Sequence, residues 1–239
     1  MERIESLTPR MQRFVLDGPE LAGLVIDEPA SSVRLLIPPA VGAALEMPTW
    51  TGNQFELSSG DRAPIRTFTP RFLDTDANEL TIDVVVHDGG AASDWAAAAS
   101  VGDEVAVSGP GRGYEIDTDA SSYLLAGDET AIPAISQLLE QIPVTTPVQV
   151  LIEVVTSDAE LDLPSHDRAE VTWHDNGDDT PGTALVAAVT DLAEMPPAIW
   201  VAGEAAAVQK IRKHLFDERG MSRSEATVRG YWKHGRSAT

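Results

Sequence analysis

The spacing of apolar and polar positions changes near residue 117. Before it, short apolar runs are separated by Gly, Pro and Ser. The runs that we expect to form strands are residues 14–16, 24–26, 33–37, 81–87 and 105–108. Short strands with frequent turn signals are typical of an antiparallel barrel or sandwich. We therefore expect residues 1–117 to fold as an antiparallel β-barrel domain.

Residues 118–239 show a different pattern, in which strand-like and helix-like segments alternate. Strands are expected at 123–126, 148–155, 171–173, 199–202 and 227–231, and helices at 131–141, 183–193 and 204–219. Such alternation predicts a doubly wound parallel sheet, so the fold class is a β-barrel followed by an α/β domain. Ligands of such sheets bind beyond the carboxyl ends of the strands. The acidic segment 117–122 is the expected linker.

The most informative stretch is Tyr123-Leu-Leu-Ala-Gly-Asp-Glu-Thr-Ala-Ile-Pro-Ala134. A short apolar strand leads into Gly127, which permits a sharp turn and close backbone approach. Thr130 can cap the following helix, and Pro133 is tolerated in its first turn. A helix start of this kind can receive a phosphate group. The same residues also suit an ordinary strand-to-helix connection.

Composition narrows the classes of function. The net charge of −21 argues against nucleic acid or an anionic membrane as a partner. Basic residues are concentrated after Val208, and this asymmetry suits either an anion site or a solvated helix face. The chain has no cysteine, so a thiolate nucleophile and a cysteine-ligated iron–sulfur cluster are excluded. Electron transfer would require an organic cofactor or a metal with other ligands.

No apolar run is long enough to span a membrane, and the first residues lack the apolar core of a signal peptide. These features predict a cytoplasmic protein, and the strong negative charge leads us to expect a monomer. The His166-Asp167 and His174-Asp175 pairs lack metal-ligand spacing and are interpreted as loops.

Several motifs occur in a characteristic order: residues 11–21, 66–71, 87–96, 102–103, 109–110, 126–134, 202–204 and 230–235. In their order and spacing the chain resembles the siderophore-interacting protein family. Members of that family are NAD(P)H-dependent ferric-siderophore reductases with an FAD-binding barrel of the ferredoxin-reductase type. The resemblance covers nearly the whole chain. It implies an FAD-binding domain at 1–117 and an NAD(P)H-binding domain at 118–239, with the C-terminal tail near the flavin.

The first flavin motif is Arg66-Thr-Phe-Thr-Pro-Arg71, where the family usually has Arg-x-Tyr-Thr-x-Arg. The resemblance implies that Arg66 pairs with an FAD phosphate, that Phe68 packs near the flavin or ribose, and that Thr69 contacts the ring. If the motif is one strand, alternation sorts its residues into two faces: Arg66, Phe68 and Pro70, against Thr67, Thr69 and Arg71. The alternative is a basic, exposed strand.

The second flavin motif runs from His87 to Ala96. Ser93 can cap an alanine-rich helix at 94–99, and the backbone N–H groups before it would receive the FAD diphosphate. The residues that the resemblance assigns to this contact are Gly90, Ala91, Ala92 and Ser93. His87 falls beside the flavin in the family, although a lone His at a strand end is more often structural. Trp95 is expected in the core.

The resemblance implies that six residues of the second domain meet the nicotinamide nucleotide: Gly127, Asp128, Glu129, Thr130, Gly203 and Glu204. Ser157 and Asp158 are expected near the adenosine ribose, where an acidic group disfavours a 2′-phosphate. Basic residues elsewhere (Arg168, Lys210 and Arg212) could approach instead, so NADPH and NADH both remain open.

The tail contributes Tyr231 and Trp232, which the resemblance places over the flavin; a core aromatic pair is the alternative for Tyr231. We further expect three cations, Arg34, Arg112 and Lys233, to form a positive mouth that attracts an anionic ferric chelate. Each also suits an ordinary surface salt bridge.

The predicted activity is reduction of a ferric siderophore by NADPH or NADH through bound FAD, with release of Fe(II) in the cytoplasm. No side chain is expected to act as a catalytic acid or base, because the cofactor carries the chemistry. One alternative is a siderophore- or iron-binding protein without turnover. Another is a flavin reductase that passes electrons to a protein acceptor.

Overall fold

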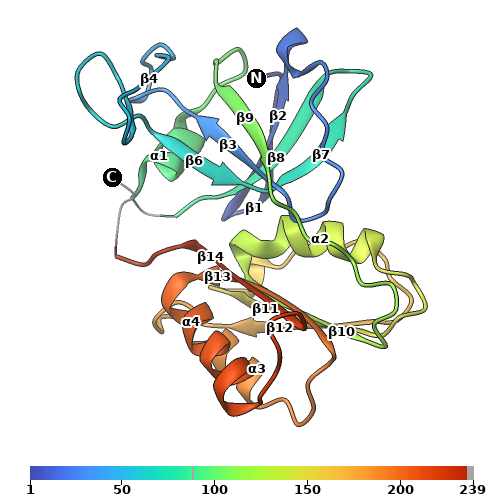
Figure 1. The fold of residues 1–239 in the computed structure, drawn as a ribbon. Coiled ribbons are helices and arrows are strands. Elements are labelled where there is room, and N and C mark those ends of the chain that lie inside the picture. Colours follow the sequence, from blue (N-terminus) through green and yellow to red (C-terminus); the bar gives the residue numbers. More distant parts are fainter. Residues whose placement is uncertain (88, 236–239) are drawn as a thin grey trace. The chain divides into compact units, whose positions relative to one another are not determined.

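The protein is described by a computed structural model that covers residues 1–87 and 89–235. The chain divides into two compact units, Met1–Tyr114 and Glu115–Gly235, whose folds are shown in Figure 1. Asp88, which belongs to the second flavin motif, and residues 236–239 lie outside the described residues.

The first unit is built from antiparallel sheets, as the short apolar runs predicted. One sheet has the order β1-β2-β8-β7, another the order β6-β3-β9, and β4 pairs with β5. Its strands are β1 (Arg3–Thr8), β2 (Met11–Asp17), β3 (Ser32–Leu36), β4 (Thr49–Trp50), β5 (Phe55–Glu56), β6 (Ile65–Phe68), β7 (Pro70–Asp74), β8 (Glu79–Val85) and β9 (Ala106–Gly111). One helix, α1 (Ala91–Ala98), follows β8.

The core of this unit joins its two larger sheets and α1. Phe14 of β2 and Ile82 of β8 are fully buried against Leu35 of β3. Trp95 of α1 packs on the same cluster, with its ring 4.8 Å from that of Phe14 between centroids. The expectation that Trp95 is a core residue is confirmed. One face of α1 is therefore anchored in the core just after β8.

Two expectations for this unit are wrong. Residues 24–26 form no strand: the Leu24 amide donates to the Leu21 carbonyl in a turn, at 3.0 Å, instead of joining a sheet. Leu24 and Ile26 still pack against the core, which accounts for their apolar character. The 66–71 motif is also not one strand, because Phe68 pairs with Val33 in one sheet while Pro70 pairs with Ile82 in the other.

The second unit contains a five-stranded sheet in the order β12-β11-β10-β13-β14, in which every neighbouring pair is parallel. Its strands are β10 (Tyr123–Asp128), β11 (Val148–Val154), β12 (Ala169–Asp175), β13 (Ala198–Glu204) and β14 (Ala226–Trp232). The helices are α2 (Ile132–Gln141), α3 (Thr183–Thr190) and α4 (Ala205–Lys213). This confirms the predicted parallel α/β architecture.

Helices lie on both faces of this sheet (Figure 1). Leu124 and Ala126 of β10 pack in a cluster with residues of α3 and α4. Gly127 belongs to the opposite face, since side chains alternate along a strand. There a Cβ would overlap that of Ala131 and approach the Ile135 side chain of α2 at 3.5 Å. The glycine is therefore needed for close packing of the helix start on β10.

The helix expected at 204–219 differs at both ends. It begins at Ala205, because Glu204 is its N-cap, and after Lys213 it continues as one wider turn, His214–Glu218. The apolar stripe lies where the spacing predicted: Val208, Ile211 and Leu215 are buried in the cluster beneath the sheet. The expected helix 183–193 ends at Thr190.

Among residues 1–87 and 89–235, no helix has the length and apolar character needed to cross a membrane. Within the same ranges, no cluster of His, Asp and Glu has the arrangement of a metal site.

Candidate functional site

The turn that leads from β8 into α1 leaves backbone N–H groups available in the first unit. Gly89 and Gly90 adopt φ values of 77° and 105°, which residues other than glycine rarely adopt. The helix begins at Ala91, so Ala91 and Ala92 occupy its first turn. Among the described residues, no side-chain oxygen accepts a hydrogen bond from the amides of Ala91 and Ala92. These groups and the helix dipole favour an anion.

Ser93 does not cap this helix as expected, because α1 starts at Ala91, three residues earlier than predicted. Its side chain is buried, and its Oγ accepts from the His87 amide at 2.9 Å and donates to the Val85 carbonyl at 3.5 Å. These bonds join the end of β8 to the first turn of α1. Ser93 therefore fixes the glycine turn, and the ring of exposed His87 lies beside Gly90, its Cε1 3.5 Å from where a Cβ would be.

Arg66 supplies positive charge in the same unit. Burial lowers the pKa of its guanidinium below the ordinary value, and the positive charge of Arg62 lowers it further. One Arg66 nitrogen, Nη1, donates to the Ile65 carbonyl at 2.9 Å. Two neighbouring guanidiniums repel each other, and an anion bound near them would relieve that repulsion.

The donors of the first unit suit an FAD diphosphate. The first turn of α1 offers backbone N–H groups behind two glycines, and the bare Cα of Gly89 faces open space, with no atom within 4 Å of a Cβ placed there. Arg66 offers a fork of charged donors that matches phosphate oxygens. The residues present therefore fit the cofactor that the motifs predicted.

The rest of the first flavin motif is distributed over two sheets. Phe68 lies opposite Val33 and packs against the core, so part of its ring is used for core contact. Thr67 is exposed, whereas Thr69, at the corner between β6 and β7, is buried. Arg71 is 8% exposed, and its guanidinium carbon lies 4.0 Å from the centroid of the Phe72 ring. Thr67 and Arg71 therefore belong to different strands, β6 and β7, and do not share one strand face.

The expected positive mouth draws on both units. Arg34 is exposed on β3, opposite Thr67 of β6 and Ser108 of β9. Because Arg66 pairs with Leu35, it points to the other face of this sheet. Arg112 is exposed in the loop after β9, and Lys233 is exposed after β14 in the second unit. The mouth remains a prediction.

In the second unit, the carboxyl edge of the parallel sheet carries the residues predicted to meet the nucleotide. The expectation that Thr130 caps the helix is wrong: Thr130 lies within a short 3₁₀ turn before α2, and Asp128 caps that turn. Its Oδ1 accepts from the Thr130 amide at 3.0 Å and from Thr130 Oγ1 at 2.5 Å. Asp128 precedes a short 3₁₀ turn, Glu129–Ala131, and α2 starts only after that turn. A carboxylate suits this position because one of its oxygens can accept from both the amide and the hydroxyl of Thr130.

Asp128 also connects three strands. Its Oδ2 accepts from the Glu204 amide and from Trp232 Nε1, each at 2.8 Å, which joins β10 to β13 and β14. The side chain is 8% exposed. Burial raises the pKa of Asp128 above the ordinary value, while the hydrogen bonds from Thr130, Trp232 and Glu204 act in the opposite direction.

The other acids at this edge also accept from backbone amides. Glu204 Oε2 accepts from Ala206 and Ala207 at 2.6 and 2.9 Å at the start of α4. Glu153 accepts from the Gly182 and Leu185 amides at 2.6 and 2.8 Å at the start of α3. Burial raises the pKa of Glu153.

The aromatic residues of the tail have different surroundings. Tyr231 is half-buried and meets the buried Trp200 edge-on, with 6.2 Å between ring centroids. Trp232 is half-buried, and its ring is oriented by the hydrogen bond to Asp128. Lys233 follows it and is exposed. The tail therefore presents an oriented aromatic ring and a cation next to each other.

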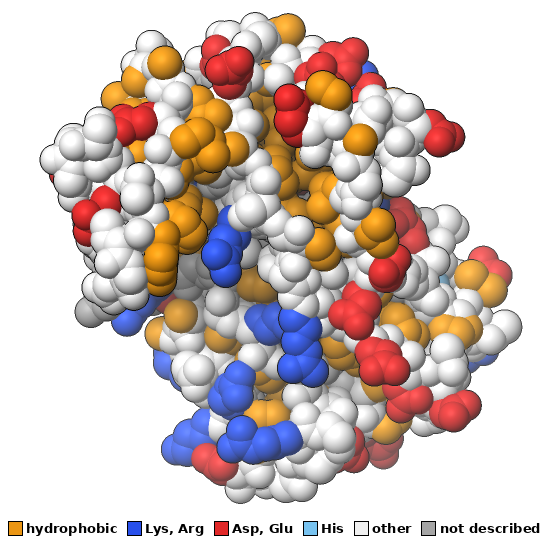
Figure 2. Space-filling model, turned by 45° about the horizontal axis from the view of Figure 1, so that its top comes forward, with side chains coloured by type: hydrophobic (Ala, Val, Ile, Leu, Met, Phe, Trp, Pro, Cys, Tyr) orange, Lys and Arg blue, Asp and Glu red, His pale blue; other side chains and the backbone are white. Residues whose placement is uncertain are grey.

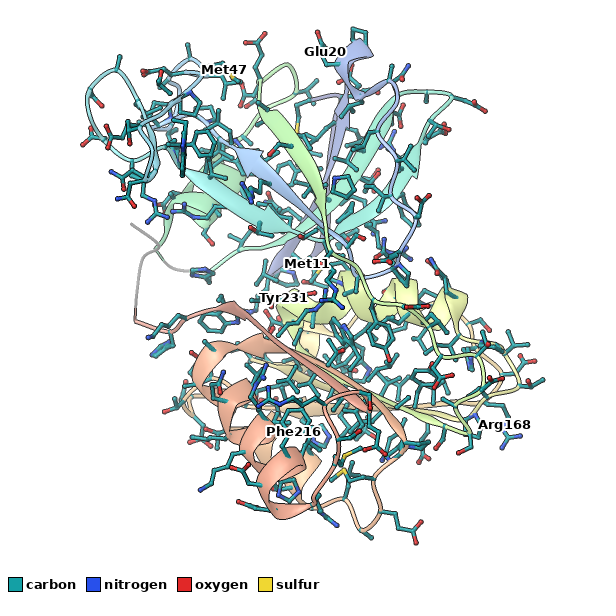
Figure 3. The ribbon with its side chains drawn as sticks, in the orientation of Figure 1. Met11, Glu20, Met47, Arg168, Phe216 and Tyr231 are labelled. Carbon is teal, nitrogen blue, oxygen red and sulfur yellow. The ribbon has the colours of Figure 1, made fainter. Side chains whose placement is uncertain are left out.

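At the end of β11, Ser157 and Asp158 are exposed, and Asp158 Oδ1 accepts from Thr156 Oγ1 at 2.5 Å. The basic residues considered for this position lie elsewhere. Arg168 precedes β12 and so belongs to the amino edge of the sheet, and Figure 3 shows it far from Tyr231. Arg212 of α4 donates to the Val228 carbonyl of β14 at 2.6 Å.

On the face that Figure 2 shows, Lys and Arg side chains lie apart from most of the Asp and Glu side chains. Arg212 and Arg223 lie on Phe216, with their guanidinium carbons 6.0 and 5.9 Å from its ring centroid. Two basic residues of the C-terminal region therefore lie on one side chain, Phe216, in the wider turn that follows α4.

Sequence reasoning missed the connection between Asp128, Glu204 and Trp232, and the role of Glu153 at the start of α3. Each acid follows or ends an apolar strand, which signals a position at the carboxyl edge. Their hydrogen-bond partners are 76 and 104 residues from Asp128 and 29 and 32 residues from Glu153. No local pattern identifies such partners.

Comparisons with known proteins agree over the whole chain. A model of the siderophore-interacting FAD-binding domain matches residues 1–114, and a model of the siderophore-interacting protein matches residues 120–235. An uncharacterised protein of Mycobacterium tuberculosis is 35% identical over 249 residues, covering 97% of this chain and 88% of the relative. The ferric vibriobactin reductase ViuB of Vibrio cholerae is 29% identical over 241 residues, covering 98% of this chain and 88% of ViuB.

Among solved structures, a siderophore utilization protein from T. fusca superposes with a TM-score of 0.87 at 34% identity. The match covers 100% of this chain and 92% of that protein.

Proposed function

Because this chain belongs to the siderophore-interacting protein family, we propose that it is an FAD-dependent reductase that uses NADH or NADPH to reduce a ferric siderophore. The substrate is the Fe(III) chelate, and the product is Fe(II), which hard oxygen ligands hold less tightly. The observation that carries the proposal is the start of α1. There a helix turn that follows two glycines, and whose first amides have no side-chain acceptor among the described residues, suits a diphosphate in an FAD-binding domain.

Each unit has a defined task in this proposal. In the first, the α1 turn and Arg66 hold the FAD diphosphate, and Phe68 and Thr69 lie at the corner where the ring system would be positioned. In the second, the carboxyl edge of the sheet receives the nicotinamide nucleotide. When bound, FAD accepts two electrons from the nucleotide and delivers them singly to iron. The protein contributes binding and orientation.

We propose NADH as the preferred donor. Asp158 lies just after β11, the second strand of the parallel-sheet unit along the chain. A carboxylate there can accept from the ribose hydroxyls and repels a 2′-phosphate. Lys210 and Arg212 belong to α4, which packs on β13 and β14. β14 is three strand spacings from β11, or roughly 14 Å. Arg168 lies at the opposite edge. None of these three basic residues therefore lies beside Asp158.

The exposed cations Arg34 and Arg112 suit a role in attracting an anionic chelate. Arg112→Ala should weaken the use of an anionic ferric chelate, with a smaller effect on a neutral chelate. Unchanged kinetics with the anionic substrate would remove Arg112 from the proposal.

The deciding experiment is visible absorption of the purified protein without oxygen. FAD is added if the protein is colourless, then NADH or NADPH, and finally a ferric siderophore. We expect a flavin band that bleaches with the nucleotide and returns as a ferrous-iron indicator develops colour. Both steps are needed for the proposed reductase.

The other outcomes separate the alternatives. A flavin that is reduced but not reoxidised by ferric chelates indicates a different acceptor, for which a protein partner is the candidate. A protein that takes up no FAD would leave a siderophore-binding role without turnover.

A further inference from the structure

The segment Trp232–His234 is tied to the ends of two inner strands by buried carboxylates. Trp232 Nε1 donates to Asp128 Oδ2 at 2.8 Å, and the His234 amide donates to Glu204 Oε1 at 3.1 Å. The Glu204 amide donates to the same Asp128 oxygen at 2.8 Å, which makes the contacts continuous. We call Asp128, Glu204, Trp232 and His234 the tail network.

An irregularity in strand pairing directs Trp232 into this network. Gly203 pairs with Gly230, but the next residue, Glu204, pairs with Trp232, so Tyr231 is an extra residue on β14. Such an insertion turns the following side chain to a new direction. Here it brings the indole N–H towards the Asp128 carboxylate while Tyr231 packs edge-on against Trp200.

The oxygens of the two carboxylates are already used. Asp128 accepts from the Thr130 amide and hydroxyl on Oδ1 and from Glu204 and Trp232 on Oδ2. A carboxylate has about four acceptor positions, so Asp128 has none left for a ribose hydroxyl. Glu204 accepts from Ala206, Ala207 and His234, and both residues are buried.

Gly203 makes room for the network. Its φ is +154°, and a Cβ there would lie 2.6 Å from Asp128 Oδ2 and 3.0 Å from Asp128 Cγ. The space that a side chain would need is occupied by the Asp128 carboxylate. The glycine at this edge is therefore explained by a protein contact, without a phosphate.

We propose that Asp128 and Glu204 are positioning residues, which hold Trp232–His234 at the carboxyl edge and act on the nicotinamide nucleotide through that segment without touching it. The groups that meet the nucleotide are then the Trp232 ring and Lys233. The inference rests on the proposed function for the identity of the nucleotide, whereas the network itself is a property of the second unit.

The first test follows the Trp232 indole N–H in the full-length protein by ¹H–¹⁵N NMR. Of the five tryptophan indole signals, the one that disappears in Trp232→Phe is assigned to Trp232. Asp128→Asn exchanges a shared acceptor oxygen for an amide of the same shape. We expect the Trp232 signal to shift and its hydrogen exchange with solvent to accelerate, while the other four indoles stay in place.

Glu153→Gln is the matched control. Glu153 is also buried, also accepts from two backbone amides at this edge, and also has a pKa raised by burial, but its recorded hydrogen bonds are to the start of α3. Its substitution should lower stability and leave the Trp232 indole signal unchanged. An unmoved Trp232 signal in Asp128→Asn, or an equal shift in Glu153→Gln, would overturn the proposal.

The second test is kinetic and uses the FAD-loaded protein. Asp128→Asn and Trp232→Phe should each raise the KM for the nucleotide about tenfold, with a smaller change in kcat. If Asp128 acts through Trp232, the KM of the double variant should be no higher than that of the single variant with the higher KM. Effects that multiply would show that Asp128 acts independently of Trp232, and the positioning role would be wrong.

The two tests fail separately from the proposed function. If neither nucleotide reduces the flavin, the proposed function is wrong, and the indole signal alone decides whether Asp128 holds the tail. If Asp128→Asn does not fold, Trp232→Phe tests the same contact from the other side. The Thr130 and Glu204 amide signals, whose donors share the Asp128 carboxylate, should then shift, and unmoved signals would overturn the network.

Discussion

The two units treat the starts of their helices in opposite ways. In the first unit, the amides of Ala91 and Ala92 have no side-chain acceptor among the described residues, and the half-buried cation Arg66 lies in the same unit. In the second unit, the protein's own carboxylates accept from the amides at this edge: Asp128 at the 3₁₀ turn before α2, Glu153 at the start of α3 and Glu204 at the start of α4.

This difference teaches which unit is suited to bind a phosphate through backbone N–H groups. An open helix start attracts an anion, whereas a carboxylate at the same place uses the donors and repels a second negative charge. A strand–glycine–helix connection is therefore an incomplete indicator of a phosphate site. Whether the first turn is open depends on side chains that arrive from distant strands.

The largest effect is expected from a substitution that displaces the Asp128 carboxylate in the second unit. Gly203→Ala would place a Cβ 2.6 Å from Asp128 Oδ2 at a φ of +154°. We expect the free energy of unfolding to fall by about 2–4 kcal/mol, as measured by urea denaturation. The control is Gly220→Ala in the same unit, which has a φ of +69° and open space and should cost only about 1–2 kcal/mol. Equal losses would contradict the role given to Gly203.

The next prediction concerns Arg66 in the first unit, where the start of α1 is open to an anion. Arg66→Ala should weaken FAD binding by about 10- to 100-fold, because charge-assisted hydrogen bonds to a phosphate are lost. Titration of the apoprotein by flavin fluorescence measures this affinity. Arg3→Ala, which removes an exposed cation paired with Glu5 in the same unit, should leave FAD affinity within about twofold. If both variants bind FAD equally well, Arg66 does not hold the phosphate.

A smaller effect is expected in how the stability of the second unit depends on pH. The pKa of Asp128 is raised in the folded protein, so its contribution to stability is fully present below the ordinary value of 3.8 and is lost as pH rises through the folded-state pKa. Asp128→Asn removes this titration. The stability of the natural protein relative to the variant should therefore decline with rising pH above about 4. Thermal unfolding midpoints of both proteins across pH 4–8 give the difference.

Glu153 provides the check on that result. Its pKa is also raised by burial, and the Asp128 charge contributes to the increase, so Glu153→Gln should show a decline of the same sign. If the natural protein instead gains stability relative to Asp128→Asn as pH rises, the hydrogen bonds to the Asp128 carboxylate outweigh the cost of burying its charge.

The smallest effect concerns the nucleotide. Asp158→Ala should raise kcat/KM for NADPH relative to NADH by about two- to fivefold, because an exposed negative charge no longer faces the 2′-phosphate. Glu160→Ala is the control, since Glu160 is an exposed acid two residues further along. A ratio that moves equally in both variants would indicate a general charge effect and no specific role for Asp158.

The predicted fold was closest to the structure where the chain pattern itself carries the information. The strands of the parallel sheet are continuous apolar runs, so β10, β11 and β13 were found with errors of one or two residues at their ends. In the first unit, 24–26 was wrong because apolar spacing reports burial and does not distinguish a strand from an irregular segment that packs on the core. The 66–71 motif was wrong because a corner between two sheets leaves no clear signal in six residues.

The candidate site shows the same limit. Ser93 and Thr130 are residue types that cap helices, and each was assigned to capping from its local position. In the structure Ser93 binds the end of β8, and Asp128 caps in place of Thr130. A capping assignment needs the helix boundary to within one residue, and boundaries depend on packing.

The sequence by itself determined the two-part architecture, the family and the positions along the chain where a cofactor and a nucleotide are expected. These depend on residue type and spacing, which are local properties. Only the tertiary structure decided which helix starts are open and which carboxylates are used within the protein. It also decided that Trp232 is held by Asp128. Those outcomes depend on hydrogen bonds between strands that are distant along the chain. A buried hydrogen-bond network is favourable only when all of its polar groups have partners.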